Sequence, residues 1–242
     1  MINMAMNNLP KKISPCPIKE AVFEMRFDSD LPQDAIFGIV YSKFKNEYSN
    51  YEQLPILQLP QVVRTQDPNL IYAPHYRLRN KHTIIQIGPK IFSLANIDEY
   101  IGWESFFELI KDTYKKVKET GVVSTLNRVA LRYINIFEDI NILEGTEFKA
   151  SLGEQVLKNE KINFSAEIPT AKSVSQLKII NSAEAIISGK KVNGSIIDID
   201  SAVDVKDFDS FESAVEYSHN EEKKLFYKVL GEEFTKTLSP EY

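Results

Sequence analysis

A strict alternation of apolar and polar residues near the N-terminus constrains the fold of this chain more than any other feature. In the stretch PIKEAVFEMRFDSD, residues 17–30, apolar side chains take one face and mostly charged side chains the other: Ala21, Phe23, Met25 and Phe27 against Glu20, Val22, Glu24, Arg26 and Asp28. A period of two is typical of a β-strand with one buried face. The sequence therefore predicts a half-buried strand with a charged outer face.

Three other segments follow helical spacing. The first is expected to open at Asp30 and Pro32 and to end near Asn50, and the second covers residues 102–121, with Gly121 as its stop. The third runs from residue 208 or 210 to about residue 235. Polar residues interrupt its apolar stripe at positions 218–224. We expect His219, which lies within this interruption, to be solvated or to cap the helix.

The remaining segments predict strands and turns. Prolines in EQLPILQLPQ, residues 52–61, predict a loop or an edge strand, because each proline lacks a ladder donor. Residues 69–96 predict an antiparallel meander, and residues 122–139 predict one long strand. Residues 162–203 predict four further strands, with turns at Gly189 and at Asn193–Gly194.

This order of segments lacks the regular alternation of strand and helix that a parallel sheet requires. We therefore predict an α+β fold, with mostly antiparallel β-sheet and three main helices packed on one face. Residues 1–16 are expected to form a flexible leader and residues 17–240 a single domain. Two related β-rich halves, residues 17–121 and 122–240, stay open as an alternative.

Composition narrows the function classes. The chain of 242 residues has 43% hydrophobic and 26% charged residues, as ordinary globular proteins do. Its net charge of −5 argues against general nucleic-acid binding. Without a long apolar run or a secretory signal, we expect a cytoplasmic protein that does not bind membranes. The single cysteine, Cys16, cannot form an internal disulfide, and we expect a buried or idle thiol.

The charges are unevenly distributed along the chain. Residues 64–90 hold five basic residues against one acid, Asp67, whereas residues 198–222 hold nine acids against one base, Lys206. This asymmetry predicts one basic and one acidic surface, which could pair within the fold, between subunits or with a partner.

Two arginines lie four residues apart in the stretch LNRVALRYIN, residues 126–135. Alternation puts Arg128 and Arg132 on one face of the strand. They could form a charged lattice with the carboxylates of the first strand. Alternatively, they could line a concave sheet that binds an anionic ligand such as a nucleotide or phosphate, because the planar guanidinium grips two oxygens at once. The full set for such a site is Arg26, Arg128, Arg132, Arg77 and Arg79. A subunit interface is the third possibility.

Asp198 and Asp200 share one face of a predicted strand. Paired carboxylates can hold Mg²⁺ or Mn²⁺ for phosphoryl chemistry, but aspartates at strand ends more often cap turns, and these could also meet the arginines. No other cofactor is indicated, because the sequence lacks a glycine-rich nucleotide loop, the H-E-x-x-H and G-x-S-x-G motifs and paired cysteines.

Aromatic residues gather near prolines in SNYEQLPILQLP and LIYAPHY, residues 49–60 and 70–76. They could form an exposed adhesive patch of the kind found at interfaces. They could equally plug the ends of the sheet.

Three stretches carry a resemblance to a known family: PIKEAVFEMRF, NRVALRYIN, and GSIIDID followed by a helix with SHNEEKKLFYKVL. Together they resemble a sporadically distributed bacterial family of unknown function, over residues 17–240. The resemblance implies a cytoplasmic bacterial α+β protein, but no catalytic residues. It also suggests a link to mobile defence or toxin-control genes.

Two function classes follow from the sequence. The first is a non-enzymatic protein-interaction, sensor or accessory module that contacts another protein or a second copy of itself, for example as a homodimer. The second is a metal-dependent enzyme that handles phosphate or nucleotides with Asp198, Asp200 and a basic sheet face.

Overall fold

The structure is a computed structural model that describes residues 9–242 apart from residues 98, 188–189 and 206–207. Its main sheet has nine strands: β1 (Ile18–Asp28), β2 (Tyr51–Gln53), β3 (Tyr76–Arg79), β4 (Thr83–Ile87), β5 (Ile91–Asn96), β6 (Thr125–Glu138), β9 (Asn163–Pro169), β10 (Ser173–Ile187) and β11 (Lys190–Asp204). A separate small hairpin consists of β7 (Ser151–Leu152) and β8 (Gln155–Val156).

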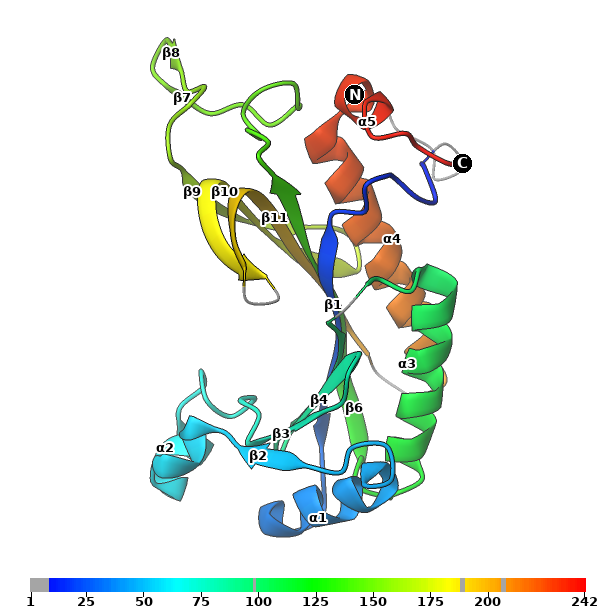
Figure 1. The fold of residues 1–242 in the computed structure, drawn as a ribbon. Coiled ribbons are helices and arrows are strands. Elements are labelled where there is room, and N and C mark those ends of the chain that lie inside the picture. The colour runs from blue at the N-terminus through cyan, green and yellow to red at the C-terminus, as the bar shows by residue number, and fades with distance from the viewer. Residues whose placement is uncertain (1–8, 98, 188–189, 206–207) are drawn as a thin grey trace. The chain divides into compact units, whose positions relative to one another are not determined.

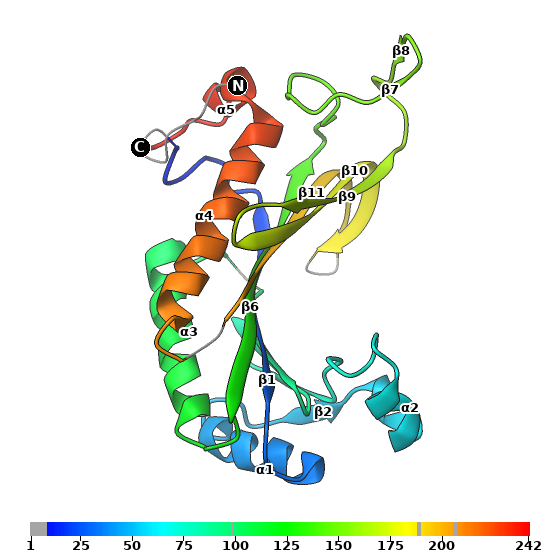
Figure 2. The ribbon, with the colours of Figure 1, turned by 180° about the vertical axis from the view of Figure 1, so that it is seen from behind.

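The helices do not alternate regularly with the strands along the chain. They are α1 (Gln33–Phe44), the 3₁₀ helix η2 (Pro55–Gln58), α2 (Gln61–Gln66), α3 (Trp103–Lys118), α4 (Phe211–Leu230) and α5 (Glu232–Lys236). The sheet is antiparallel with strand order β2-β3-β4-β5-β1-β6-β11-β10-β9, and α1, α3 and α4 pack on it (Figure 1; Figure 2 shows the reverse view). The predicted α+β class is confirmed.

The chain divides into two compact units. Unit 1 holds the described part of Met1–Lys19, then Arg132–Ser201 and Tyr217–Tyr242, and unit 2 holds Glu20–Leu131 and Ala202–Glu216. Each unit therefore draws on several segments, unlike the halves 17–121 and 122–240 that the sequence left open. No described helix combines the length and the apolar composition needed to span a bilayer.

Unit 2 is built on the alternating strand that opens the chain. In β1 every second side chain, from Ala21 to Phe27, is buried, while Glu24 and Arg26 lie half-buried on the other face. The meander β3-β4-β5 is confirmed, and β5 pairs with β1 in a register that sets Phe23 opposite Leu94. The strand β2 lies at the edge of the sheet with all its residues exposed, as the prolines after it predict.

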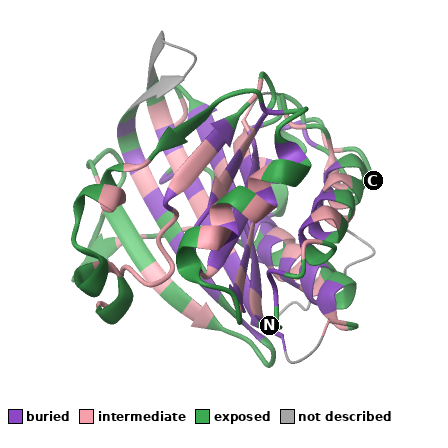
Figure 3. Ribbon diagram, turned by 90° about the horizontal axis from the view of Figure 1, so that it is seen from below, coloured by how far each residue is buried: buried purple, intermediate pink, exposed green. Residues whose placement is uncertain are grey.

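The two main helices of unit 2 bury one stripe each, as Figure 3 shows by the change from buried to exposed around each helix. In α3 the buried residues are Phe106, Ile110, Thr113, Tyr114 and Val117, and the helix contacts α1 and β5. The helix α1 ends at Phe44 and not near Asn50. The apolar pattern extends further because Tyr48, beyond the helix, is also buried and its hydroxyl lies 2.5 Å from Thr83 Oγ1.

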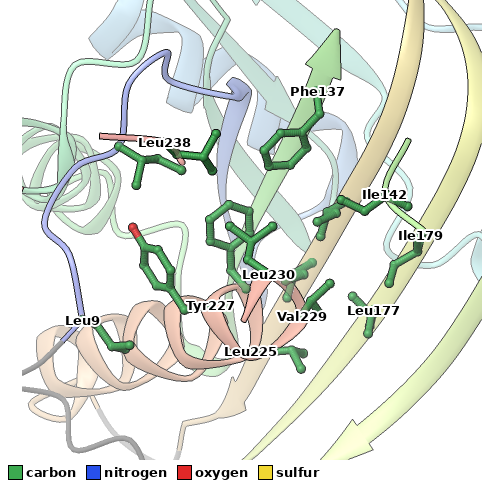
Figure 4. Packing of buried hydrophobic residues seen from close by; sticks show 14 residues of the cluster. Leu9, Phe137, Ile142, Leu177, Ile179, Leu225, Tyr227, Val229, Leu230 and Leu238 are labelled. Atoms are coloured by element: carbon green, nitrogen blue, oxygen red, sulfur yellow. The ribbon is translucent and has the colours of Figure 1, made fainter. Parts of the chain in front are cut away.

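Unit 1 has its own hydrophobic cluster, shown in Figure 4. Side chains of α4, including Leu225, Val229 and Leu230, pack against Phe137 of β6 and against the inner residues of β10 and β11. Leu9 and Ile13, within the predicted leader, are buried in the same cluster, and Cys16 is exposed. The first eight residues of that leader lie outside the described residues.

Two boundaries predicted in unit 1 are wrong. The strand β11 runs straight through Asn193–Gly194, where a turn is predicted, because Gly194 is needed for close packing: a side chain there would collide with the Phe137 backbone. The terminal helix is divided at Gly231, whose φ of +75° separates α4 from α5. The other predicted turn, at Gly189, lies outside the described residues.

One strand also replaces two. The sequence predicts separate strands on either side of residue 182, whereas β10 continues from Ser173 to Ile187. At Ser182 the backbone adopts a left-handed conformation, with φ of +56°, without ending the strand.

Candidate functional site

The central arginine of β6 is held by an aspartate of the neighbouring strand β11. Arg132 Nε donates to Asp198 Oδ1 at 2.8 Å, and Arg132 Nη2 donates to Asp198 Oδ2 at 2.6 Å. This bidentate arrangement matches the fork of the guanidinium to both carboxylate oxygens. The Arg132 side chain is 46% exposed, but that of Asp198 is only 13% exposed. The pair therefore shields a carboxylate that is largely removed from water.

Two of the other predicted arginines also have carboxylate partners. Arg26 Nε donates to Glu24 Oε1 at 2.9 Å, and its guanidinium carbon lies 4.5 Å from the centre of the Tyr72 ring. Arg77 Nη1 donates to Glu52 Oε1 at 2.7 Å. These contacts neutralise part of the charge that an anionic ligand would need.

The other residues of the two predicted sites are Arg128, Arg79 and Asp200. Arg128 is half-buried on β6, and Arg79 is exposed at the end of β3. Asp200 is half-buried on the same face of β11 as Asp198. Among the residues that the structure describes, no three His, Cys, Asp or Glu side chains are grouped so that they could hold a metal ion. The Mg²⁺ or Mn²⁺ site at Asp198 and Asp200 and the five-arginine anion site stay predictions.

The polar interruption of the terminal helix is partly buried, which corrects the prediction that His219 is solvated or caps the helix. Ser218 and Glu222 are both removed from water, and Ser218 Oγ donates to the Ser201 carbonyl oxygen. The Ser201 hydroxyl in turn lies 2.5 Å from the Ser175 hydroxyl. His219 is half-buried, with Nδ1 3.3 Å from the Tyr133 hydroxyl. Polar residues of α4 thus face the sheet because β6, β10 and β11 offer them hydrogen-bonding partners.

Burial strongly shifts the pKa values of three side chains of α4. It raises the pKa of Glu222 to about 8, against a smaller opposing effect of Lys223. It lowers the pKa of His219 to about 3, and the positive charge of Lys223 adds to this shift. It also raises the pKa of Tyr227, with a further contribution from Glu222. All three groups are therefore held in their neutral forms near pH 7.

A small basic pocket lies in unit 2 between the start of α1, α2 and the turn from β4 to β5. Its volume is about 30 Å³, and it is lined by Gln33, Arg64, Thr65, Ile71, His75, Pro89 and Lys90. The backbone fixes the buried His75, whose N–H donates to the Ile87 carbonyl at 2.9 Å and whose own carbonyl accepts from the Leu54 N–H at 2.9 Å. The pocket is therefore built on a rigid sheet edge.

Arg64 supplies the accessible charge of this pocket. Its Nη1 lies 3.3 Å from His75 Nδ1, and its Nε donates to the Leu59 carbonyl at 3.1 Å. Burial and, to a smaller extent, the positive charge of Arg64 lower the pKa of His75 to about 4, while Asp34 opposes the shift. The guanidinium of Arg64 therefore lies against a neutral imidazole. Lys90, the second cation, forms an ion pair with Asp28 at 2.7 Å.

Apolar side chains are exposed next to this pocket. The helix α2, which contributes Arg64 and Thr65 to the pocket wall, has no buried residue. Val62 is 60% exposed and Val63 43% exposed, and Leu59 just before the helix is also exposed. We call Leu59, Val62, Val63 and the basic pocket the α2 surface. The sequence indicated it only through the basic residues of the 64–90 segment.

The aromatic residues near the prolines are partly packed and partly exposed. Phe37 of α1 stacks on Tyr76 of β3, with ring centres 3.7 Å apart. Tyr51 contacts Phe37 at 5.0 Å and Tyr41 at 5.4 Å, yet it stays exposed on β2.

Comparison with protein-family models and with curated proteins finds no match for this chain. The resemblance to a sporadically distributed bacterial family therefore stays a prediction.

Proposed function

We propose that this chain is a non-enzymatic protein-interaction module and that its partner binds at the α2 surface. The observation that carries this proposal is an apolar surface beside a fixed charge: Val62 and Val63 are exposed on a helix whose next residue, Arg64, lines a cationic pocket. Exposed apolar residues beside a fixed charge are typical of protein-binding surfaces.

The dimensions of the pocket indicate what the partner presents. A volume of about 30 Å³ admits a small group but not a nucleotide. Arg64 can bind a carboxylate through the N–H groups that His75 and Leu59 leave unused, because a guanidinium has five donors. The partner is therefore a protein segment in which an aspartate or glutamate is flanked by apolar residues.

The contact between Arg132 and Asp198 supports this proposal over the metal-dependent enzyme. Both oxygens of Asp198 accept hydrogen bonds from Arg132. A metal ion at Asp198 would have to replace these charge-assisted bonds, which costs free energy. The cytoplasmic location and the link to defence genes are further parts of the proposal that rest on sequence alone.

A displayed library of random peptides, selected against the purified protein, tests the proposal. We expect enriched peptides to carry an acidic residue next to apolar residues. Synthetic peptides should then bind Arg64→Ala and Val62→Asp at least ~10-fold more weakly than the unsubstituted protein, which corresponds to about 1.4 kcal/mol. Val156→Asp is the matched control, because Val156 is similarly exposed but lies on β8 in unit 1.

The proposal fails if Arg64→Ala and Val62→Asp bind the selected peptides as tightly as the control does, or if the peptides share no acidic position. Sedimentation velocity identifies the partner further. A dimer that Val62→Asp converts to a monomer would show that the partner is a second copy of this chain.

A further inference from the structure

The strand β9 is the last strand at one end of the main sheet, and it belongs to unit 1. Its one neighbour in the sheet is β10, and most of its residues are exposed. The outer edge of such a strand carries backbone N–H and C=O groups that can pair with a further strand. This edge lies in a different unit from the α2 surface, so the proposed function does not use it.

The register of β9 on β10 decides which backbone groups point outwards. The Thr170 N–H donates to the Ser173 carbonyl at 2.8 Å, and the Asn181 N–H donates to the Ile162 carbonyl at 3.1 Å. In this register the even-numbered residues of β9 exchange hydrogen bonds with β10, and in an antiparallel pair the intervening residues point their N–H and C=O groups away from the partner strand. The outward-pointing N–H groups therefore belong to Asn163, Ser165 and Glu167.

The sequence of β9 is complementary to itself when two copies run antiparallel. If Phe164 of one copy lies opposite Phe164 of the other, Lys161 of each copy lies opposite Glu167 of its partner, because both are three residues from Phe164. The same alignment sets Asn163 opposite Ser165, so the outward-pointing backbone groups meet each other. Opposite charges and aromatic rings directly across such a pair are stabilising.

The side chains of β9 suit this alignment. Phe164 is 37% exposed, and its ring centre lies 5.1 Å from that of Phe148. Glu167 is held on the opposite face of the strand, where its Oε2 accepts from Gln176 Nε2 at 2.7 Å, and the exposed Lys161 shares that face. An alignment centred on Glu167 would instead set two carboxylates against each other.

We propose that β9 pairs with β9 of a second copy of this chain, which joins the two sheets in a dimer whose twofold axis passes between the two Phe164 residues. Such an interface uses the same surface of both copies, so each favourable contact occurs twice. The charge match between Lys161 and Glu167 favours a second copy over another extended segment.

Disulfide cross-linking of the full chain tests both the dimer and its alignment. In a Cys16→Ser background, which removes the single cysteine, Phe164→Cys places two thiols across the axis. Residues opposed in this way have Cα atoms about 4.5 Å apart, within the ~4.4–6.8 Å that a disulfide spans. Ser165→Cys is the matched control, because the two residues 165 lie diagonally, about 7–8 Å apart. We expect Phe164→Cys to form a covalent dimer at least ~10-fold faster than the control.

Sedimentation velocity between ~5 and ~200 μM protein measures the dimer without a cross-link. Glu167→Lys sets lysines against each other and should weaken the dimer at least ~10-fold, and its combination with Lys161→Glu should restore it, because the two charges are then exchanged. A change in the fold of β9 alone would not be restored in this way.

Four results would overturn the inference. They are a monomer at ~200 μM, cross-linking of Ser165→Cys as fast as that of Phe164→Cys, a dimer that Glu167→Lys leaves unchanged, and no restoration by the exchange of charges. Val62→Asp, which tests the α2 surface, should leave this dimer intact. Failure of the β9 pairing and failure of the proposed function are therefore distinguishable.

Discussion

Arg132 and Asp198, which are 66 residues apart in the chain, form a two-point ion pair between β6 and β11, with donor–acceptor distances of 2.8 and 2.6 Å. The pair is asymmetric, because the arginine reaches water while the aspartate is largely covered. Removal of the arginine would leave a poorly hydrated carboxylate without its partner. This asymmetry makes the pair a structural element of unit 1.

We expect Arg132→Ala to lower the free energy of unfolding by about 1–2 kcal/mol, less than for a fully buried pair because the arginine is partly solvated. Urea denaturation measures this loss. Lys43→Ala is the matched control, since Lys43 pairs with Glu119 at 3.5 Å with both side chains exposed, and its loss should stay within ~0.5 kcal/mol. Equal stability of both variants would contradict a structural role for the pair.

Buried Glu222 should make the protein less stable as the pH rises. Its pKa is raised from 4.5 to about 8, so between these values the folded state keeps a proton that the unfolded chain has released. Stability therefore falls through this window by up to ~1.4 kcal/mol per pH unit. Glu222→Gln removes the effect. In urea denaturation at pH 5, 6.5 and 8, the advantage of this variant over the unsubstituted protein should grow with pH, and a constant difference would refute the prediction.

His219 should have the opposite dependence. Its pKa is lowered from 6.5 to about 3, so the unfolded chain binds a proton first as the pH falls. Its contribution to stability is complete above pH 6.5 and is lost towards pH 3. We expect acid to destabilise the unsubstituted protein more than His219→Gln. His75, with a pKa lowered to about 4, adds a loss of the same sign.

Comparison of the two α4 variants between pH 4.5 and 6.5 provides a check that either variant alone lacks. In this window Glu222→Gln should make the slope of stability against pH more positive, and His219→Gln should make it more negative. Slopes that change in the same direction would show that burial does not control both groups.

Gly194→Ala should destabilise unit 1 although glycine usually weakens a strand. A methyl group at this position would collide with the carbonyl group of Phe137, and backbone cannot rotate away as a side chain can. We expect a loss of about 1–3 kcal/mol. Gly38→Ala, in the middle of α1 with open space around the added methyl group, should instead raise stability by ~0.5–1 kcal/mol. Thermal melts of both variants measure the contrast, and a gain in both would contradict the close approach.

Periodicity was sufficient for the regular elements. The alternation from Ala21 to Phe27 predicts β1, and the stripe from Phe106 to Val117 predicts α3, because each pattern reports which side of an element is apolar. It was insufficient where a residue serves a neighbour in space. Gly194 is read as a turn from its sequence, but its small size accommodates Phe137, which lies 57 residues earlier in the chain.

The candidate sites show the same division. The basic segment from residue 64 to residue 90 is visible in the sequence, but the arginines predicted as its working residues were Arg77 and Arg79, whereas the pocket gathers Arg64, His75 and Lys90. The polar residues of the terminal helix are likewise visible, and their burial is not. A polar side chain can be buried wherever another element supplies its hydrogen-bonding partner, and no local pattern reports that partner.

The sequence by itself determined the α+β class, the principal strands and helices, and the face of β6 on which Arg132 lies. Only the tertiary structure decided that Arg132 meets Asp198, that Glu222 of α4 is buried while His219 lies against the Tyr133 hydroxyl, and that Arg64 lies against His75. The physical reason is that side-chain direction follows from local backbone geometry, which repeats every 2 or 3.6 residues, whereas the partner on the other side of a contact comes from a distant segment brought close by folding.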